Sequence, residues 1–206
     1  EWHLISEADL VVGIGVRNTE ILTAKPFGKT TVLVDEVDDG LADGFQADLL
    51  RVDADSDEIA DLFDILSEKK WGLDSLDSLR QSMRRAMLDT QWLPASCFEI
   101  LNGLDFPYTE VMDTGSFCTI GEHLWRAGPT RSFLGGSNDR YMGVALPSAL
   151  GVALARPGVP VFCIVGDGGI RTYPAEMKLA VQEGLPLCVI LMTDGRYGSV
   201  ACAPQS

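Results

Sequence analysis

The sequence has little positive charge, little histidine and no long apolar run. Lys and Arg number 16 against 30 Asp and Glu, which leaves a net charge of −14 at pH 7. A surface of this sign repels phosphate backbones and anionic lipids, so we expect neither nucleic-acid binding nor membrane attachment. No apolar run reaches the about 18 residues that a membrane-spanning helix needs. The first ten residues also show neither the basic nor the apolar region of a signal peptide.

Cysteine and histidine are too few and too scattered to indicate a zinc site or a disulfide framework. The five cysteines are an odd number without a CxxC pair, and there are two histidines. Cys163 and Cys188 lie inside apolar runs, where a reduced thiol behaves as a small hydrophobic side chain. We therefore expect a protein of the reducing cytoplasm.

The first third of the sequence has an α/β pattern. Apolar runs predict short strands at Leu10–Gly15, Thr30–Asp35 and Leu49–Asp53. A helical pattern with an acidic first turn follows between Asp57 and Leu66. Residues 1–68 are thus predicted to form part of a parallel α/β layer.

Residues 69–95 mix charged residues with serine and predict a linker that carries one polar helix. The α/β pattern returns at residues 96–206. Helices are predicted there at Cys97–Leu104, Gly143–Ala155 and Pro174–Glu183. Val161–Val165 and Leu187–Met192 are apolar throughout, which predicts strands in the middle of a parallel sheet covered by helices. Because both ends of the sequence fall inside unfinished α/β layers, we expect part of a longer polypeptide.

A run of glycines around an acidic residue carries the clearest chemical signal. Gly166, Asp167, Gly168 and Gly169 stand directly after one of these strands and before a predicted helix. Glycine lets the backbone approach a ligand closely, and the amides at a helix N-terminus favour a phosphate group. The carboxylate of Asp167 is the kind of oxygen ligand that Mg²⁺ prefers.

A second acidic residue is predicted to lie beside the first. The next strand ends in Thr193 and Asp194, and Asp194 follows Asp167 by 27 residues. A strand–helix–strand crossover of this length brings both carboxylates to the same edge of a parallel sheet, where ligands bind. Together the motifs predict a metal–diphosphate site, whereas each one alone is equally typical of an ordinary loop or turn.

These motifs resemble those of thiamin-diphosphate-dependent enzymes of the acetolactate synthase and pyruvate decarboxylase type. The GDG sequence at 166–168, with Thr193-Asp194 starting 25 positions after its last glycine, is similar to the family's GDG and NN motif. Residues 141–151 (YMGVALPSALG) are similar to its TMGYGLPAAIG stretch, and residues 174–177 (PAEM) to its NPQEL. Residues 7–15 (EADLVVGIG) are similar to a segment in the second half of its central domain.

The resemblance implies a fold class and a domain order. Residues 1–68 would be the C-terminal part of a Rossmann-like central domain, and residues 69–95 a linker. Residues 96–206 would be an incomplete thiamin-diphosphate-binding domain with a parallel α/β sheet.

The resemblance also assigns roles around thiamin diphosphate and Mg²⁺. Asp167, Asp194 and the backbone carbonyl of Arg196 would bind the metal ion. Met142 would be the bulky side chain beneath the thiazolium ring that keeps the cofactor bent, although a lone methionine is more typical of a core. The other cofactor contacts would come from Gly115, Ser116, Arg140, Gly166, Gly168 and Gly169.

The sequence departs from the family at the metal and substrate positions. Thr193 and Asp194 replace two asparagines, and residues 138–140 (Asn-Asp-Arg) replace Gly-Leu-Gly. These changes argue against a standard acetolactate synthase. The family's activating glutamate comes from a separate pyrimidine-binding domain without a counterpart here, so no catalytic side chain is assigned. We expect that domain of another subunit to complete the site, in a homodimer or homotetramer.

The expected activity is cleavage or formation of a carbon–carbon bond in a small carbonyl substrate, a 2-oxo acid or a diketone. Decarboxylation, with or without ligation to a second carbonyl compound, is the first expectation. A lyase or a diketone hydrolase is the alternative within the class. A non-catalytic nucleotide- or phosphate-binding subunit, or a structural subunit with a decayed site, is the alternative outside it. Whether the central domain also binds FAD is left open.

Overall fold

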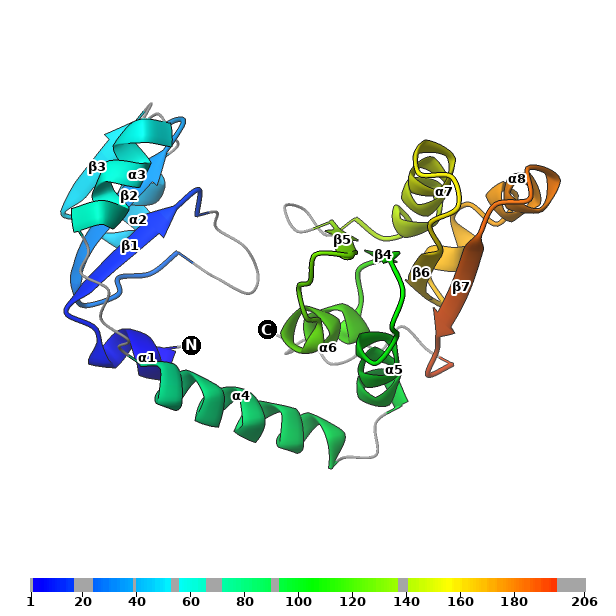
Figure 1. Cartoon of the computed structure of the whole chain (residues 1–206), viewed down its shortest axis with the longest axis horizontal. Helices are drawn as coiled ribbons and strands as arrows, with labels where there is room; N and C mark the ends of the chain where they lie inside the picture. Colours follow the sequence, from blue (N-terminus) through cyan, green and yellow to red (C-terminus); the bar gives the residue numbers. More distant parts are fainter. Residues whose placement is uncertain are drawn as a thin grey trace, which may run out of the picture. The chain divides into compact units, whose positions relative to one another are not determined.

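The computed structural model divides the chain into two compact units, residues 1–83 and residues 84–206. It describes residues 2–16, 24–38, 40–52, 56–65, 72–89, 93–136 and 141–195. Each unit builds its own parallel β-sheet, with three strands in the first and four in the second (Figure 1). None of the described helices combines the length and the hydropathy that crossing a membrane requires.

The first unit confirms the three strands predicted from its apolar runs. They are β1 (Leu10–Ile14), β2 (Thr30–Asp35) and β3 (Leu49–Val52). They pair in parallel in the order β1-β2-β3. The helix predicted after β3 is α3 (Ser56–Ile65). Two short helices, α1 (Trp2–Glu7) and α2 (Leu41–Phe45), were not predicted from the sequence.

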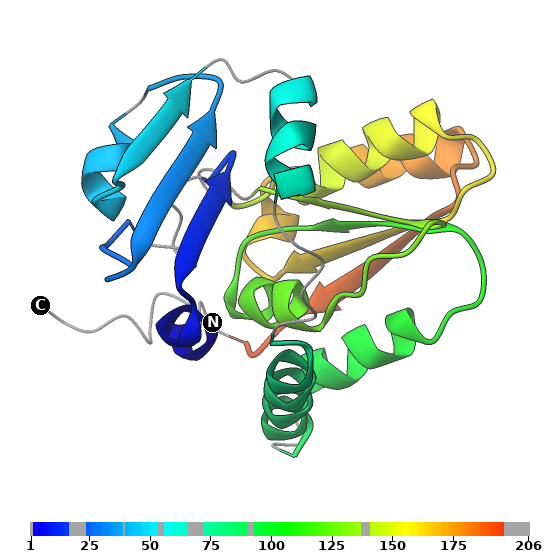
Figure 2. The same ribbon diagram turned by 60° about the vertical axis from the view of Figure 1, so that its left-hand side comes forward.

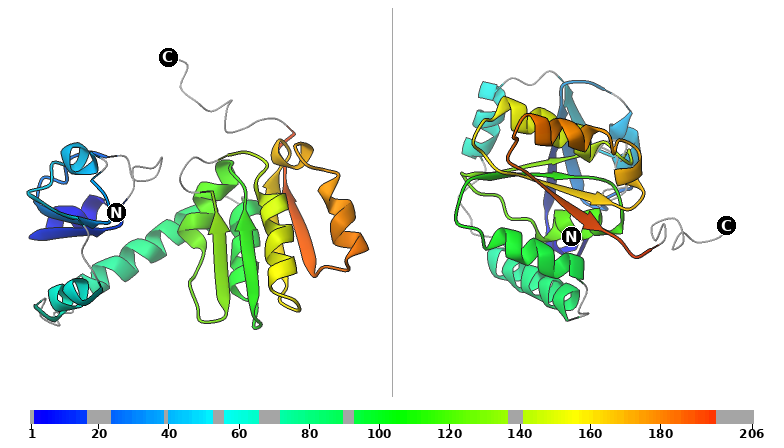
Figure 3. Two further views of the ribbon diagram at one scale, coloured as in Figure 1. Left: turned by 90° about the horizontal axis from the view of Figure 1, so that it is seen from above. Right: turned by 90° about the vertical axis from the view of Figure 1, so that its right-hand side faces the viewer.

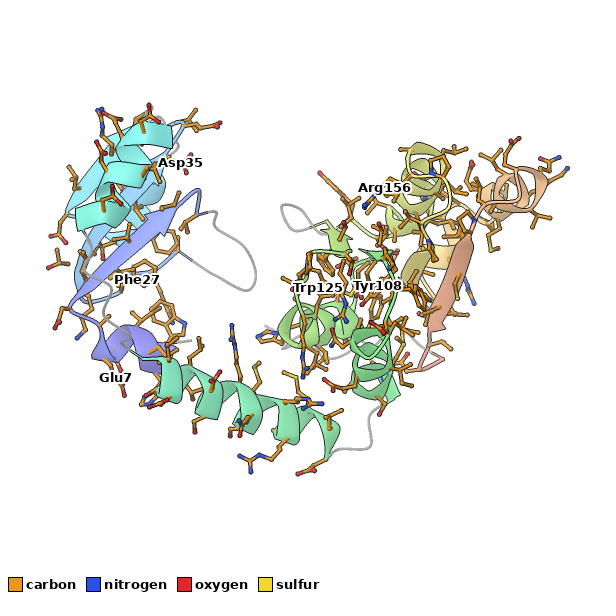
Figure 4. All side chains as sticks on the ribbon, viewed as in Figure 1. Glu7, Phe27, Asp35, Tyr108, Trp125 and Arg156 are labelled. Carbon is orange, nitrogen blue, oxygen red and sulfur yellow. The ribbon has the colours of Figure 1, made fainter. Side chains whose placement is uncertain are left out.

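Contacts between aromatic side chains stabilise the two short helices of the first unit. Phe45 of α2 is fully buried, and its ring stacks on that of Phe27 with centroids 5.0 Å apart (Figure 4 labels Phe27). Trp2 of α1 lies 5.5 Å from the same Phe27 ring, and the ammonium group of Lys25 lies over Trp2. Helices this short are unstable alone, so ring packing is what stabilises them.

The polar helix predicted in the linker is present as α4 (Leu73–Leu88). It has no buried residue among those described. The boundary between the two units falls within it, after Met83. Near its end, the guanidinium of Arg84 forms an ion pair with the carboxylate of Glu99 on α5 (Leu93–Asn102), which ties the last turns of α4 to the second unit.

The second unit is a parallel sheet in the order β5-β4-β6-β7. Its strands are β4 (Tyr108–Met112), β5 (Arg131–Gly135), β6 (Val161–Gly166) and β7 (Leu187–Met192). Its α-helices are α5, α6 (Ser116–Leu124), α7 (Ala145–Ala155) and α8 (Glu176–Gln182). Because the strands run in the same direction, their carboxyl ends share one edge of the sheet (Figure 3, left).

Two apolar layers pack this sheet between helices. On one face, Phe98 of α5 packs with Met112 and with side chains of α6. On the other face, Ala149 of α7 packs with Val111 and Cys163, and α8 lies beside α7 (Figure 2). Val111 and Met112 enter different layers because neighbouring residues of a strand point to opposite faces.

Two expectations for this sheet are wrong. β7 lies at the edge of the four described strands rather than in the middle, and its Leu191 is 50% exposed. Cys188 of the same strand is exposed, whereas Cys163 is the buried small hydrophobe that was expected. Burial raises the pKa of the Cys163 thiol to about 12. An apolar sequence shows that a strand tolerates burial on both faces, but not which neighbours cover it.

One carboxylate lies inside the layer beneath α5. Glu110 of β4 shares its face of the sheet with Met112 and is fully buried. Neither carboxylate oxygen has a hydrogen-bond partner among the described residues, and burial raises the pKa of Glu110 to about 7. Burial and, secondly, the charge of Glu110 raise the pKa of the Cys97 thiol on α5. The folded state therefore favours the protonated form of Glu110.

Arg156, directly after α7, joins that helix to two strands (Figure 4). Its Nη1 donates to Thr109 Oγ1 of β4 at 3.0 Å and to Ser132 Oγ of β5 at 2.9 Å. Its backbone amide donates to the carbonyl of Val152 at 2.9 Å, which closes the last turn of α7. Thr109 is buried, so its hydroxyl has little access to water if the guanidinium is removed.

Arg156→Ala is expected to lower the free energy of unfolding by about 1–2 kcal/mol, because a buried hydroxyl loses its partner. Urea unfolding followed by tryptophan fluorescence measures the change, since Trp125 belongs to this unit. Lys178→Ala removes the same charge from an exposed position on α8 and serves as the control. Equal unfolding midpoints for the two variants would contradict the linking role of Arg156.

Candidate functional site

The carboxyl edge of the second sheet gathers polar residues that are distant in the sequence. Asp113 follows β4, Asp167 follows β6, and Thr193 and Asp194 follow β7. The turn before α7 reaches the same edge, because the amide of Gly143 donates to Asp113. Parallel pairing of β4, β6 and β7 is what brings these segments together.

The glycine-rich loop begins at Gly166, the last residue of β6. Asp167 is half-buried, and Gly168 and Gly169 are buried. A single 3₁₀ turn at Gly169–Arg171 follows, and the helix predicted at Pro174–Glu183 is present as α8, which begins five residues after that turn. The main-chain amides nearest to Asp167 along the chain are therefore those of the loop and of this turn.

Close packing excludes a side chain at Gly169. A Cβ there would overlap a carboxylate oxygen of Asp113 and would lie 3.0 Å from Val165 Cγ2. The φ angle of Gly169 is not in the positive region, so the constraint is space alone. The loop thus brings its main chain closer to the end of β4 than any other residue would allow.

Oxygen donors meet at the ends of β6 and β7. The hydroxyl of Thr193 donates to Asp167 Oδ2 at 3.4 Å and accepts from the amide of Gly195 at 3.1 Å. Asp194 follows and is exposed. Carboxylate and hydroxyl oxygens are what Mg²⁺ prefers, so the residues present fit this ion. In the part of the chain that the structure describes, no three His, Cys, Asp or Glu side chains form a metal cluster by themselves, and Arg196 lies outside that part.

Met142 is exposed beside a turn that requires glycine. Its side chain is 53% exposed, so the alternative of a core methionine does not describe this structure. Gly143 has a φ of +93°, and a Cβ there would lie 2.6 Å from Thr172 Oγ1. Both the backbone conformation and the close approach call for glycine. Arg140, the neighbouring candidate, lies outside the described residues.

Gly115 and Ser116 stand at the start of α6, an element that the sequence did not predict. Gly115 has a φ of +154°, and a Cβ there would overlap the ring of Phe117. Ser116 is the first residue of the helix and is exposed. Both follow directly after the end of β4, on the same edge of the sheet as the glycine-rich loop.

Asp113 is a residue of this edge that the sequence analysis missed. It is 1% exposed, and the Gly143 amide lies 2.9 Å from each of its carboxylate oxygens. Burial raises the pKa of Asp113, while hydrogen bonds from the amides of Gly143, Thr114, Val144 and Ala145 lower it. An acidic residue at a strand end, two residues before Gly115, is a signal that the sequence does offer. Its main partner, however, is 30 residues away in the sequence.

Known proteins match this part of the chain. Residues 113–205 match the family model described as "Thiamine pyrophosphate enzyme, C-terminal TPP binding domain". The matched region begins at Asp113 and contains all of the metal and cofactor candidates.

Similar full-length proteins are acetolactate synthases. That of Bacillus subtilis (strain 168) is 31% identical over 103 residues, which cover 50% of this chain and 18% of that enzyme. The isozyme 1 large subunit of Escherichia coli (strain K12) is 26% identical over 221 residues, covering 96% of this chain and 37% of that subunit. The isozyme 2 large subunit of the same organism is 36% identical over 87 residues, which cover 39% of this chain and 16% of that subunit. The chain thus spans well under half the length of each of these relatives.

These findings confirm the resemblance to thiamin-diphosphate enzymes of the acetolactate synthase type. They also agree with the parallel α/β fold expected for a thiamin-diphosphate-binding domain. The domain limits at residues 68 and 96 and the roles of the individual metal and cofactor residues stay predictions.

Proposed function

We propose that the protein carrying this chain uses thiamin diphosphate and Mg²⁺ to cleave or form a carbon–carbon bond in a 2-oxo acid or diketone. One observation carries the proposal. The hydroxyl of Thr193 donates a hydrogen bond to the carboxylate of Asp167, next to the buried glycines and at the carboxyl edge of the sheet in the matched domain. The acetolactate synthase relatives favour decarboxylation followed by carboligation as the first reaction to test. A lyase or diketone hydrolase is the alternative within this class.

The residues of this edge would hold the cofactor with backbone groups and the metal ion with oxygen atoms. Main-chain groups would face the cofactor at Gly115, Ser116, Arg140, Gly166, Gly168 and Gly169. Asp167 and Asp194, with the carbonyl of Arg196, would hold Mg²⁺. Met142 would support the thiazolium ring from its exposed position. When bound, thiamin diphosphate supplies a carbanion for attack on a carbonyl group and then an electron sink.

The active form is proposed to be a homodimer or homotetramer. The pyrimidine-binding domain of another subunit would supply the activating glutamate and part of the substrate pocket. The cytoplasm is the proposed compartment, because the five cysteines are an odd number without a CxxC pair.

Asp167→Ala is expected to abolish the Mg²⁺-dependent binding of thiamin diphosphate. Losing even an indirect partner of a metal ligand costs about 10- to 100-fold in affinity, so losing a direct carboxylate ligand should cost about 100-fold or more. Calorimetric titration of thiamin diphosphate into the full-length protein, with and without Mg²⁺, measures this effect.

Asp105→Ala is the matched control, since it removes the same charge from an exposed loop at the amino end of β4. It should bind as the wild type does. If the wild-type oligomer does not bind thiamin diphosphate, the proposal fails and a structural subunit remains. Preferential binding of ADP would instead indicate a nucleotide-binding subunit. Confirmed binding makes a screen of 2-oxo acids and diketones the next experiment.

A further inference from the structure

Asp113 lies at the junction of three segments that are distant in the sequence. It directly follows β4, and its amide donates to the carbonyl of Ile164 on β6 at 2.9 Å, which extends the sheet by one residue. Its carboxylate then reaches the turn before α7. Because the residue is 1% exposed, its carboxylate interacts with protein groups rather than with bulk water.

The first contact of the Asp113 carboxylate is with the turn that carries Met142. The amide of Gly143 lies 2.9 Å from both oxygens, and the amides of Val144 and Ala145 hydrogen-bond the same group. These amides open α7, and the side chain of its N-cap residue Val144 makes no capping hydrogen bond. The carboxylate of Asp113 therefore takes the place of a local cap and fixes the backbone directly after Met142.

The second contact is with the glycine-rich loop. A Cβ at Gly169 would overlap Asp113 Oδ2, so the two residues are in direct contact. Thr172, one residue beyond the 3₁₀ turn, packs on Gly143, where a Cβ would lie 2.6 Å from its hydroxyl oxygen. There is thus no room for a Cβ atom at Gly143 or Gly169, where the turn, Asp113 and the segment 169–172 pack together.

We propose that Asp113 is a positioning residue that sets the distance between the Met142 turn and the glycine-rich loop. The inference rests on the proposed function, in which the turn supports the thiazolium ring and the loop holds the diphosphate. Asp113 acts through Gly143 and Gly169 and does not contact the reacting atoms. One carboxylate therefore controls whether both halves of the cofactor can be held at once.

Asp113→Asn tests this role with little change in volume. The variant keeps the packing against Gly169 but replaces one acceptor oxygen with an NH₂ group that cannot accept from the amides of the turn. We expect the affinity for thiamin diphosphate with Mg²⁺ to fall about tenfold or more, the size of one lost charge-assisted hydrogen bond. The affinity for inorganic pyrophosphate with Mg²⁺, which probes the diphosphate half alone, should stay close to that of the wild type.

Titration calorimetry of the full-length protein with both ligands gives the ratio of the two affinities. The near-ultraviolet circular dichroism of the bound cofactor should change as well, because it reports on the geometry of the rings. A merely structural role would lower both affinities together and leave their ratio unchanged. Asp105→Asn makes the same substitution at an exposed position of the loop before β4 and should leave both affinities as in the wild type.

The outcomes separate this inference from the proposed function. If the wild type binds thiamin diphosphate and Asp113→Asn shows an unchanged ratio, this inference alone is overturned. If the wild type does not bind thiamin diphosphate, both fail. Should Asp113→Asn not fold, Gly143→Ala displaces the same turn by contact with Thr172 while Asp113 stays intact. A selective loss of thiamin diphosphate affinity there supports the inference, and equal losses for both ligands overturn it.

Discussion

Glu110→Met is expected to raise the free energy of unfolding at pH 8 by about 3 kcal/mol and to flatten its dependence on pH. Glu110 is buried, and its pKa is about 7 in the folded protein against an ordinary value of 4.5. The folded state therefore binds the proton more tightly than the unfolded state does. The stability that this proton contributes is fully present below the ordinary value and is lost as the pH rises through about 7.

Methionine suits the position because it is unbranched, apolar and of similar length. Glu110 faces the layer that holds Met112 and Phe98, and no described residue hydrogen-bonds its carboxylate. Removing the carboxylate therefore leaves no partner without a hydrogen bond. This differs from a buried ion pair, where removing one member isolates the other.

Urea unfolding of the wild type and of Glu110→Met at a series of pH values between about 5 and 8 measures the effect. Glu183→Met, at an exposed position after α8, is the control for the loss of one negative charge. The wild type and the control should lose stability across this range, and Glu110→Met should not. A wild-type stability that stays constant from pH 6 to pH 8 would show that Glu110 is not a buried acid.

The second large effect is expected for Gly169→Ala. The added methyl group would overlap the Asp113 carboxylate and press on Val165, so either the loop or the end of β4 must move. Forcing one extra carbon into a filled space costs about 1–3 kcal/mol of folding free energy. The same movement separates the loop from the turn at Gly143, so the affinity for thiamin diphosphate should also fall, by about tenfold.

Gly151→Ala is the matched control for Gly169→Ala. Gly151 lies on α7, and a Cβ there would meet nothing within 4 Å. Alanine should therefore stabilise the helix, by up to about 1 kcal/mol. Thermal or urea unfolding of both variants, followed by titration with thiamin diphosphate and Mg²⁺, gives the two readouts. Equal stability and equal affinity for the two variants would refute the packing argument at Gly169.

Much of the fold could be predicted because its strands are strongly apolar. The runs at β2, β6 and β7 have sharp glycine or acidic ends, so the predicted and observed strands agree closely. The structure adds α6, which opens after Gly115, and β5, whose sequence Arg-Ser-Phe-Leu-Gly lacks an apolar run. Both depend on long-range contacts: β5 pairs with β4, and Phe98 of α5 packs on Gly121 of α6.

Part of the candidate site could likewise be predicted from the sequence, and part of it could not. The GDG motif and the spacing from Asp167 to Asp194 lie in a short stretch of sequence, so they could be recognised without a structure. The hydrogen bond from Thr193 to Asp167 depends on β6 and β7 being neighbours, whereas in the sequence alone Thr193 is only a departure from the family's motif. Asp113 was missed for the same reason, because its partners come from other strands and turns.

By itself, the sequence determined the parallel α/β class, the thiamin-diphosphate motif and the residues that carry it, because apolar periodicity and glycine spacing are local properties of a chain. The tertiary structure alone decided that β7 lies at the edge of the described sheet, that Glu110 is buried without a partner, and that Asp113 joins the Met142 turn to the glycine-rich loop. Each of these depends on which surfaces meet after folding. Burial and close contact are set by neighbours in space, whatever their distance along the chain.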